Sequence, residues 1–72
     1  MAHYSWVHLR YRGRLVRITT RYGSPMSAQV MQGKPLDIGP LDDWKPNRDA
    51  KRLLRLFDRE QRRNPEYGEF PY

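Results

Sequence analysis

A series of basic residues near the end of the chain recurs at intervals of three and four positions. The series consists of Arg48, Lys51, Arg52, Arg55, Arg59, Arg62 and Arg63. If this segment is helical, a rotation of about 100° per residue gathers the whole series within roughly 120° of one face. Like charges at this spacing cost an isolated helix about 0.2–0.5 kcal/mol per pair, so a solvated helix surface normally mixes both signs. Because the forked guanidinium group binds phosphate bidentately, the series predicts a helix face that binds an anion, and nucleic acid is the commonest such partner.

A second candidate surface combines aromatic and basic residues in the first third of the chain. Its members are Tyr4, Trp6, His8, Arg10, Arg17 and Arg21. Aromatic rings beside arginine can stack on unpaired bases, an interaction worth ~1–3 kcal/mol per base. The alternative is structural, because tryptophan in so small a protein usually covers a core. The sequence leaves both interpretations open.

Catalytic and metal-binding patterns have little support. The chain has no cysteine, and His3 and His8 are five positions apart, so they face opposite sides of a strand. No serine has the setting of a nucleophile, and no glycine-rich loop could hold a phosphate. A nuclease centre built from His8, Arg17 and Arg21 is a weaker alternative, since a small domain seldom encloses a deep pocket. We therefore expect a binding protein without enzymatic activity, cofactor or metal.

The net charge of +6 is distributed in blocks along the 72 residues. Residues 1–36 contain six bases and no acid, residues 37–44 contain three acids, and the strongly basic segment follows. This length predicts a single small domain. The chain has no apolar run of the ~20 residues that a membrane span needs, and its start does not resemble a signal peptide. We expect a cytoplasmic protein that does not bind membranes.

The elements that position both surfaces begin with a predicted β-hairpin over residues 3–22. Apolar and polar residues alternate on each side of Arg12-Gly13, where glycine permits a two-residue turn. This turn fixes the register, because a slip of one residue would mix the two faces. The expected pairs are Val7–Ile18, Leu9–Val16, His8–Arg17, Trp6–Thr19 and Tyr4–Arg21. One face is then apolar, and the other carries the aromatic-basic set.

The middle of the chain allows two interpretations. We favour a weaker hairpin in residues 26–39 that turns at Gln32-Gly33, with Leu36 and Ile38 in a returning strand. The alternative is a short helix that begins at Ser24-Pro25 and ends at Gly33. Residues 39–46 read as a connector.

Asn47 is a suitable cap for a helix over residues 47–63, and Asn64-Pro65 ends that helix. The sequence thus predicts an α+β domain, residues 1–64, in which the C-terminal helix packs on a small antiparallel sheet. Residues 65–72 form an extended acidic-aromatic tail, which could be ordered or frayed. The predicted core consists of Val7, Leu9, Val16, Ile18, Ala50, Leu53, Leu54 and Phe57. The two candidate surfaces then point in opposite directions.

These features favour a small basic module that binds DNA or RNA mainly through phosphate contacts. Its size and arginine content are typical of a regulatory or accessory protein, for example in transcription. The alternative is a phage-type regulator or inhibitor that docks on an acidic surface of a nucleic-acid enzyme, such as RNA polymerase or a nuclease. Aromatic anchors for such a protein interface are Trp6, Trp44 and Tyr67. The oligomeric state does not follow from the sequence.

Overall fold

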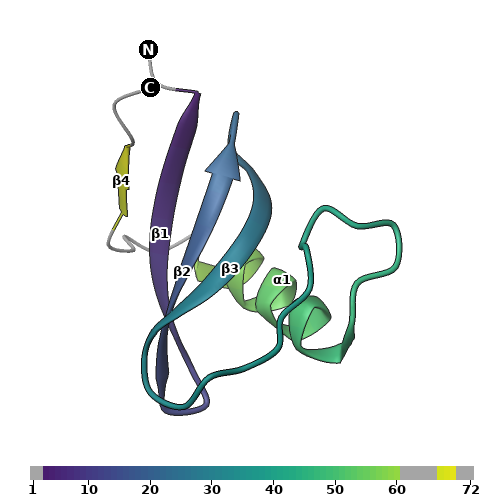
Figure 1. Ribbon diagram of the computed structural model, residues 1–72. Coiled ribbons are helices and arrows are strands. Elements are labelled where there is room, and N and C mark those ends of the chain that lie inside the picture. Colours follow the sequence, from purple (N-terminus) through teal and green to yellow (C-terminus); the bar gives the residue numbers. More distant parts are fainter. Residues whose placement is uncertain (1–2, 61–66, 70–72) are drawn as a thin grey trace.

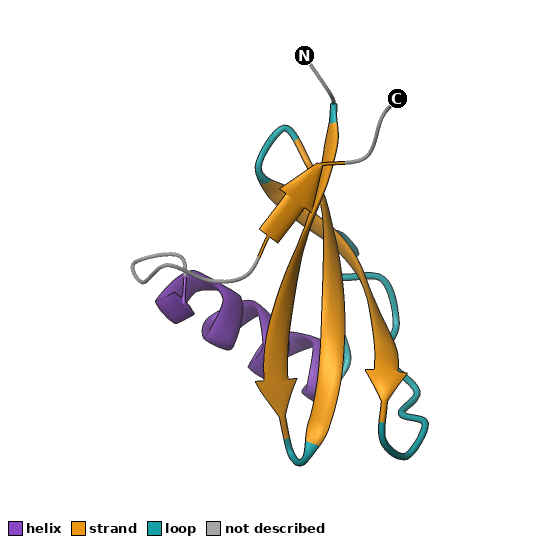
Figure 2. Cartoon of the chain, turned by 90° about the vertical axis from the view of Figure 1, so that its left-hand side faces the viewer, coloured by secondary structure: helices purple, strands orange, loops and turns teal. Residues whose placement is uncertain are grey.

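The computed structural model describes residues 3–60 and 67–69. Within these residues the strands β1 (Tyr4–Tyr11), β2 (Arg14–Arg21), β3 (Ser24–Gln32) and β4 (Tyr67–Glu69) form one antiparallel sheet, ordered β3-β2-β1-β4 (Figure 1). The helix α1 (Arg48–Glu60) lies across one face of the sheet (Figure 2). The predicted α+β architecture, an antiparallel sheet with a C-terminal helix, is confirmed.

The hairpin of β1 and β2 has the predicted register. Val7 pairs with Ile18, and Leu9 pairs with Val16. The turn between the strands has positive φ angles at both central residues, 48° at Arg12 and 75° at Gly13. A turn of this kind matches the right-handed twist of the flanking strands, which explains why the chain selects this register.

The prediction of a hairpin over residues 26–39 is wrong, because these residues contribute only the third strand of the sheet and no returning strand. A second two-residue turn, with φ of 52° at Tyr22 and 83° at Gly23, returns the chain directly from β2 into β3. Gln32 ends β3 instead of opening a turn into another strand, so Leu36 and Ile38 pack against the core from a loop. The alternative of a short helix at residues 24–33 is also wrong. Tyrosine is uncommon with positive φ, so the sequence alone does not indicate a turn at Tyr22-Gly23.

The core lies between the sheet and α1. Its buried members are Val7, Leu9, Tyr11, Val16, Ile18, Leu41, Ala50, Leu53 and Phe57. Leu54, which was predicted to be buried, is half-buried at the margin. Leu41 was not predicted, because it belongs to the connector and follows no periodic pattern. Its backbone N–H donates to the carbonyl oxygen of Met26 at 2.8 Å, so the connector is held against β3.

The start of α1 is capped as predicted. The Asn47 side-chain oxygen accepts a hydrogen bond from the backbone N–H of Ala50 at 2.8 Å. The predicted end of the helix, residues 61–63, lies outside the described residues. The described part of the tail is extended, since residues 67–69 form β4 along β1. No helix in the described ranges combines the length and the apolar character that crossing a membrane requires.

Candidate nucleic-acid interface

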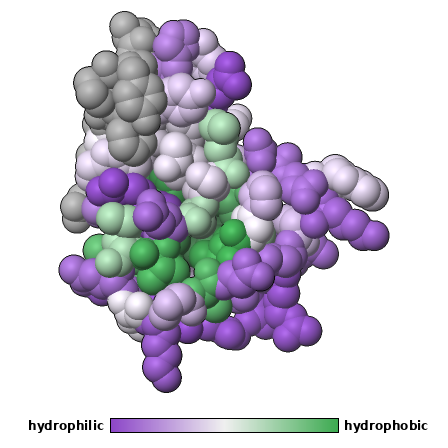
Figure 3. All heavy atoms as spheres, viewed as in Figure 1, coloured by the Kyte–Doolittle hydropathy of each residue, from purple (hydrophilic) through white to green (hydrophobic). Residues whose placement is uncertain are grey.

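The outer face of α1 carries the described members of the basic series. Ala50, Leu53 and Phe57 turn toward the sheet and are buried. The exposed basic side chains on the other face are Arg48, Lys51, Arg52, Arg55 and Arg59, and the exposed Asp58 lies at the edge of this face. Arg62 and Arg63 lie outside the described residues. The space-filling view shows the face of the molecule that lies in front of α1, where apolar atoms gather in the lower middle and hydrophilic atoms surround them (Figure 3).

Three of these arginines surround a hollow on the side of α1 that faces β1. Arg52, Arg55 and Arg59 line it together with Tyr11 and Leu56, and its volume is about 250 Å³. Its lining combines guanidinium groups with an aromatic ring and a leucine side chain. Such a lining suits a ligand that carries both negative charge and apolar surface, as a nucleotide does.

A hydrogen bond beside this hollow fixes the position of one acidic side chain. The phenol of Tyr11 donates to Oδ1 of Asp49 at 2.7 Å, which ties β1 to the first turn of α1. Burial, followed by this hydrogen bond, raises the pKa of Tyr11, and an opposing hydrogen bond from Arg52 lowers it in part. The phenol, which is protonated at neutral pH, holds the Asp49 carboxylate at the flank of the basic face.

The aromatic-basic set lies on the opposite face of the sheet, and the structure brings three of its members together. The Cζ atom of Arg17 lies 4.9 Å from the centroid of the Trp6 ring, and its Nε donates to Nε2 of His8 at 3.1 Å. The rings of Trp6 and His8 are 4.4 Å apart between centroids, at an angle of 31°. Cation–π attraction and one hydrogen bond thus join the three side chains into a cluster on β1 and β2.

The same cluster covers the short strand β4. A Cβ atom added at Gly68 would lie 2.4 Å from the Trp6 ring, so the indole occupies the space above this glycine. An aromatic ring over a glycine of the neighbouring strand is a known device for stabilising a sheet edge. The contact supports the structural interpretation of Trp6.

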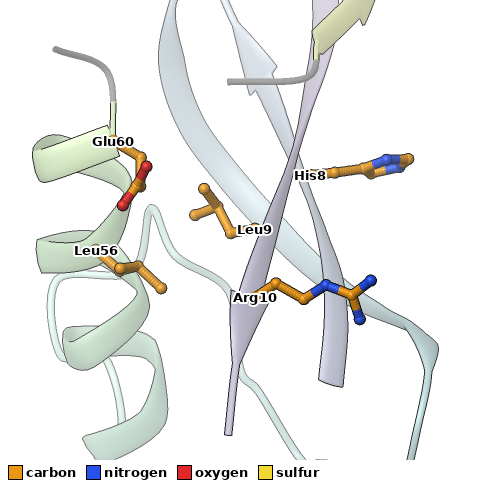
Figure 4. A pocket seen from close by; sticks show the side chains of 5 residues that line it. All are labelled: His8, Leu9, Arg10, Leu56 and Glu60. Carbon is orange, nitrogen blue, oxygen red and sulfur yellow. The ribbon is translucent and has the colours of Figure 1, made fainter. Parts of the chain in front are cut away.

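The other members of the aromatic-basic set are spread along the sheet. Tyr4 is half-buried, whereas Arg10 and Arg21 are exposed. The Arg21 guanidinium lies 5.9 Å from the Tyr22 ring instead of joining the cluster. His8 and Arg10 point away from α1, as the close-up of the neighbouring pocket shows (Figure 4).

That pocket lies between β1 and the C-terminal part of α1 and has a volume of about 270 Å³. Leu9, Leu56 and Glu60 face one another across it (Figure 4). Glu60 is the acidic member of its lining. Among the described residues, no three histidine, aspartate or glutamate side chains gather as a metal site would require.

Sequence reasoning missed the part that Tyr11 plays at the helix face, although its alternation with Val7 and Leu9 placed it on the apolar side of β1. A phenol at the end of a buried row and an aspartate in the first turn of the helix are the signals that could have indicated this contact. No protein-family model, no curated protein and no solved structure matches this chain.

Proposed function

We propose that this protein is a small, non-enzymatic module that binds nucleic acid through phosphate contacts made by the outer face of α1. The observation that carries the proposal is the exposure of five basic side chains on one helix face. The acidic residue of the first turn, Asp49, is held at its flank by Tyr11. A domain that binds nucleic acid without catalysing a reaction would have a regulatory or accessory role in nucleic-acid transactions.

The length of the basic face fits several phosphates of one strand. Arg48 and Arg59 are eleven residues apart, so their Cα atoms are separated by about 16 Å along the helix axis. Phosphates of one strand of B-DNA follow one another every ~3.4 Å along the duplex axis, so this distance covers four or five of them. We expect these contacts to be insensitive to base sequence, because phosphates carry no sequence information.

The alternative function is that of a protein-binding regulator, which would use the same face against an acidic partner surface. The exposed Trp44, in the loop before α1, supports it, because tryptophan is frequent among the residues that dominate protein interfaces. Nucleic acid is the stronger proposal, since it accounts for the arginine content of the whole helix face.

The test is the salt dependence of binding to short duplex DNA, single-stranded DNA and RNA between about 50 and 200 mM salt. Arg52→Ala and Arg55→Ala each remove one charge from the proposed interface. Arg10→Ala removes the same charge from the opposite face of the sheet and serves as the matched control. We expect the two helix variants to weaken binding to all sequences alike and the control to change it little. Equal effects of all three variants, or no measurable binding even at about 50 mM salt, would contradict the proposal and favour the protein-binding alternative.

A further inference from the structure

The loop between β3 and α1 presents an indole to solvent. Trp44 is 88% exposed, whereas Trp6, the other tryptophan of the chain, is half-buried in the cluster on the sheet. An apolar side chain of this size gains free energy when it is covered, so such exposure commonly marks a binding position. The question is which ligand covers it.

The loop that carries Trp44 is fixed at both ends. On one side, Leu41 is buried and its N–H bonds to the Met26 carbonyl oxygen at 2.8 Å. On the other side, Asn47 caps α1 and donates from its side-chain nitrogen to the Asp37 carbonyl oxygen at 3.3 Å. Only a few residues separate these two attachments. The indole is therefore held near one place on the surface, which lowers the entropy cost of binding a ligand there.

The charges beside Trp44 indicate which part of a nucleic acid would meet it. Asp42 and Asp43, which precede Trp44 in the chain, are exposed, so their charges repel a phosphate that approaches this part of the loop. Carboxylates accept hydrogen bonds from the amino groups of bases, as they do from cytosine. The Lys45 ammonium lies 5.5 Å from the centroid of the indole ring and can attract a phosphate that follows a stacked base. The tip of the loop thus suits a base, with phosphates toward α1.

We propose that Trp44 stacks on an unpaired base of the strand whose phosphates the outer face of α1 binds, so that single-stranded nucleic acid is bound more tightly than a duplex. The inference rests on the proposed function. Trp44 precedes Arg48, the first basic residue of α1, by four positions, so their Cα atoms are at most about 15 Å apart. One short strand can therefore reach both. A duplex keeps its bases paired and stacked, and it offers no base face to the indole away from its ends.

The experiment compares Trp44→Ala with the native chain for a short single-stranded oligonucleotide and for a duplex of the same sequence. Loss of one stacked base weakens single-strand binding by about 5- to 150-fold. Duplex binding stays unchanged, and Trp44→Phe restores most of the single-strand affinity because it retains an aromatic ring. Tyr22→Ala is the matched control, since Tyr22 is 71% exposed at the turn between β2 and β3 and should leave both affinities unaltered.

Tryptophan fluorescence gives a second readout that does not depend on affinity. Subtracting the emission of Trp44→Phe from that of the native chain isolates the signal of Trp44. We expect saturating single-stranded oligonucleotide to quench this signal and duplex to leave it unchanged.

Two results would overturn the inference while the proposed function stands. In the first, Trp44→Ala has the same affinity for single strands as the native chain, although Arg52→Ala lowers that affinity. In the second, Trp44→Ala weakens duplex and single strand equally. If the native chain binds neither ligand even at about 50 mM salt, both proposals are wrong and Trp44 becomes a candidate anchor for a protein partner.

Discussion

The double variant Arg52→Ala/Arg55→Ala provides the strictest test of the helix face. Both residues are exposed and line the hollow beside Tyr11. Because the buried Ala50, Leu53 and Phe57 pack α1 on the sheet, we expect the fold to tolerate the change, including the loss of the hydrogen bond from Arg52 to Tyr11. The logarithm of the binding constant for duplex DNA falls by about 0.9 per phosphate contact for each tenfold rise in salt. The number of contacts therefore sets the size of the effect.

Five contacts, one for each exposed basic residue of α1, correspond to a slope of about −4.5, which weakens duplex binding about 500-fold between 50 and 200 mM salt. The double variant keeps three of these contacts, which correspond to a slope of about −2.7 and a loss of affinity of about 40-fold over the same range. Fluorescence anisotropy of a labelled duplex at four or more salt concentrations measures both slopes. Circular dichroism of the two proteins shows whether α1 is intact in the variant.

The control for this measurement is Arg10→Ala/Arg21→Ala, which removes two exposed charges from the face of the sheet that lies away from α1. A long-range effect of net charge would change the salt slope of both double variants by the same amount. A local effect changes the slope only for the helix variant. If the slope of the helix variant equals that of the native protein, phosphate contacts at Arg52 and Arg55 do not exist and the reasoning is refuted.

Substitutions at three further positions test contacts within the fold. Tyr11→Phe removes the hydrogen bond to Asp49 and should lower the free energy of unfolding by about 1 kcal/mol in thermal melts. Because the pKa of Tyr11 is raised in the folded state, the unfolded chain loses this proton first as pH rises. The stability that this shift contributes is thus present below pH ~10 and falls above it. The free energy of unfolding of Tyr11→Phe should therefore decline less steeply above pH ~10 than that of the native protein. Asn47→Ala removes the cap and should lower the free energy of unfolding by about 1 kcal/mol. Asn47→Asp keeps the accepting oxygen and should lower it less. If both variants lose the same free energy of unfolding, the hydrogen bond to Asp37 contributes more than the cap. Gly68→Ala places a Cβ 2.4 Å from the Trp6 ring and should alter the near-ultraviolet circular dichroism of that indole, and an unchanged spectrum would argue against the contact.

The hairpin of β1 and β2 was predictable because two independent signals agree on it. Alternation at Val7 and Leu9 defines a face, and Arg12-Gly13 supplies a turn of two residues that fixes the partner of each position. The capped start of α1 was predictable for a similar reason, since Asn47 stands immediately before the amphipathic pattern. Local chemistry is sufficient for such elements.

The middle of the chain was less predictable because its local signals compete. Tyr22-Gly23 and Gln32-Gly33 both offer glycine for a turn, and the first is used. That choice lets Ala28 and Val30 join the core beside β2, a tertiary contact that no short window of sequence contains. The burial of Leu41 has the same origin, since its place depends on a hydrogen bond to Met26 across the fold.

The two basic surfaces differ in whether their side chains make contacts that stabilise the fold. On the sheet, Arg17 is engaged with Trp6 and His8, and Trp6 covers Gly68, so these side chains stabilise the attachment of β4 to β1. On α1, the apolar side forms the core, and the exposed arginines lie outside it, although Arg52 also bonds to the Tyr11 phenol. Like charges three and four positions apart cost the helix about 0.2–0.5 kcal/mol per pair, so the basic row does not help α1 to form. This contrast is the physical reason for placing the proposed ligand on α1 and beside Trp44, and for treating the aromatic-basic face of the sheet as support for the fold.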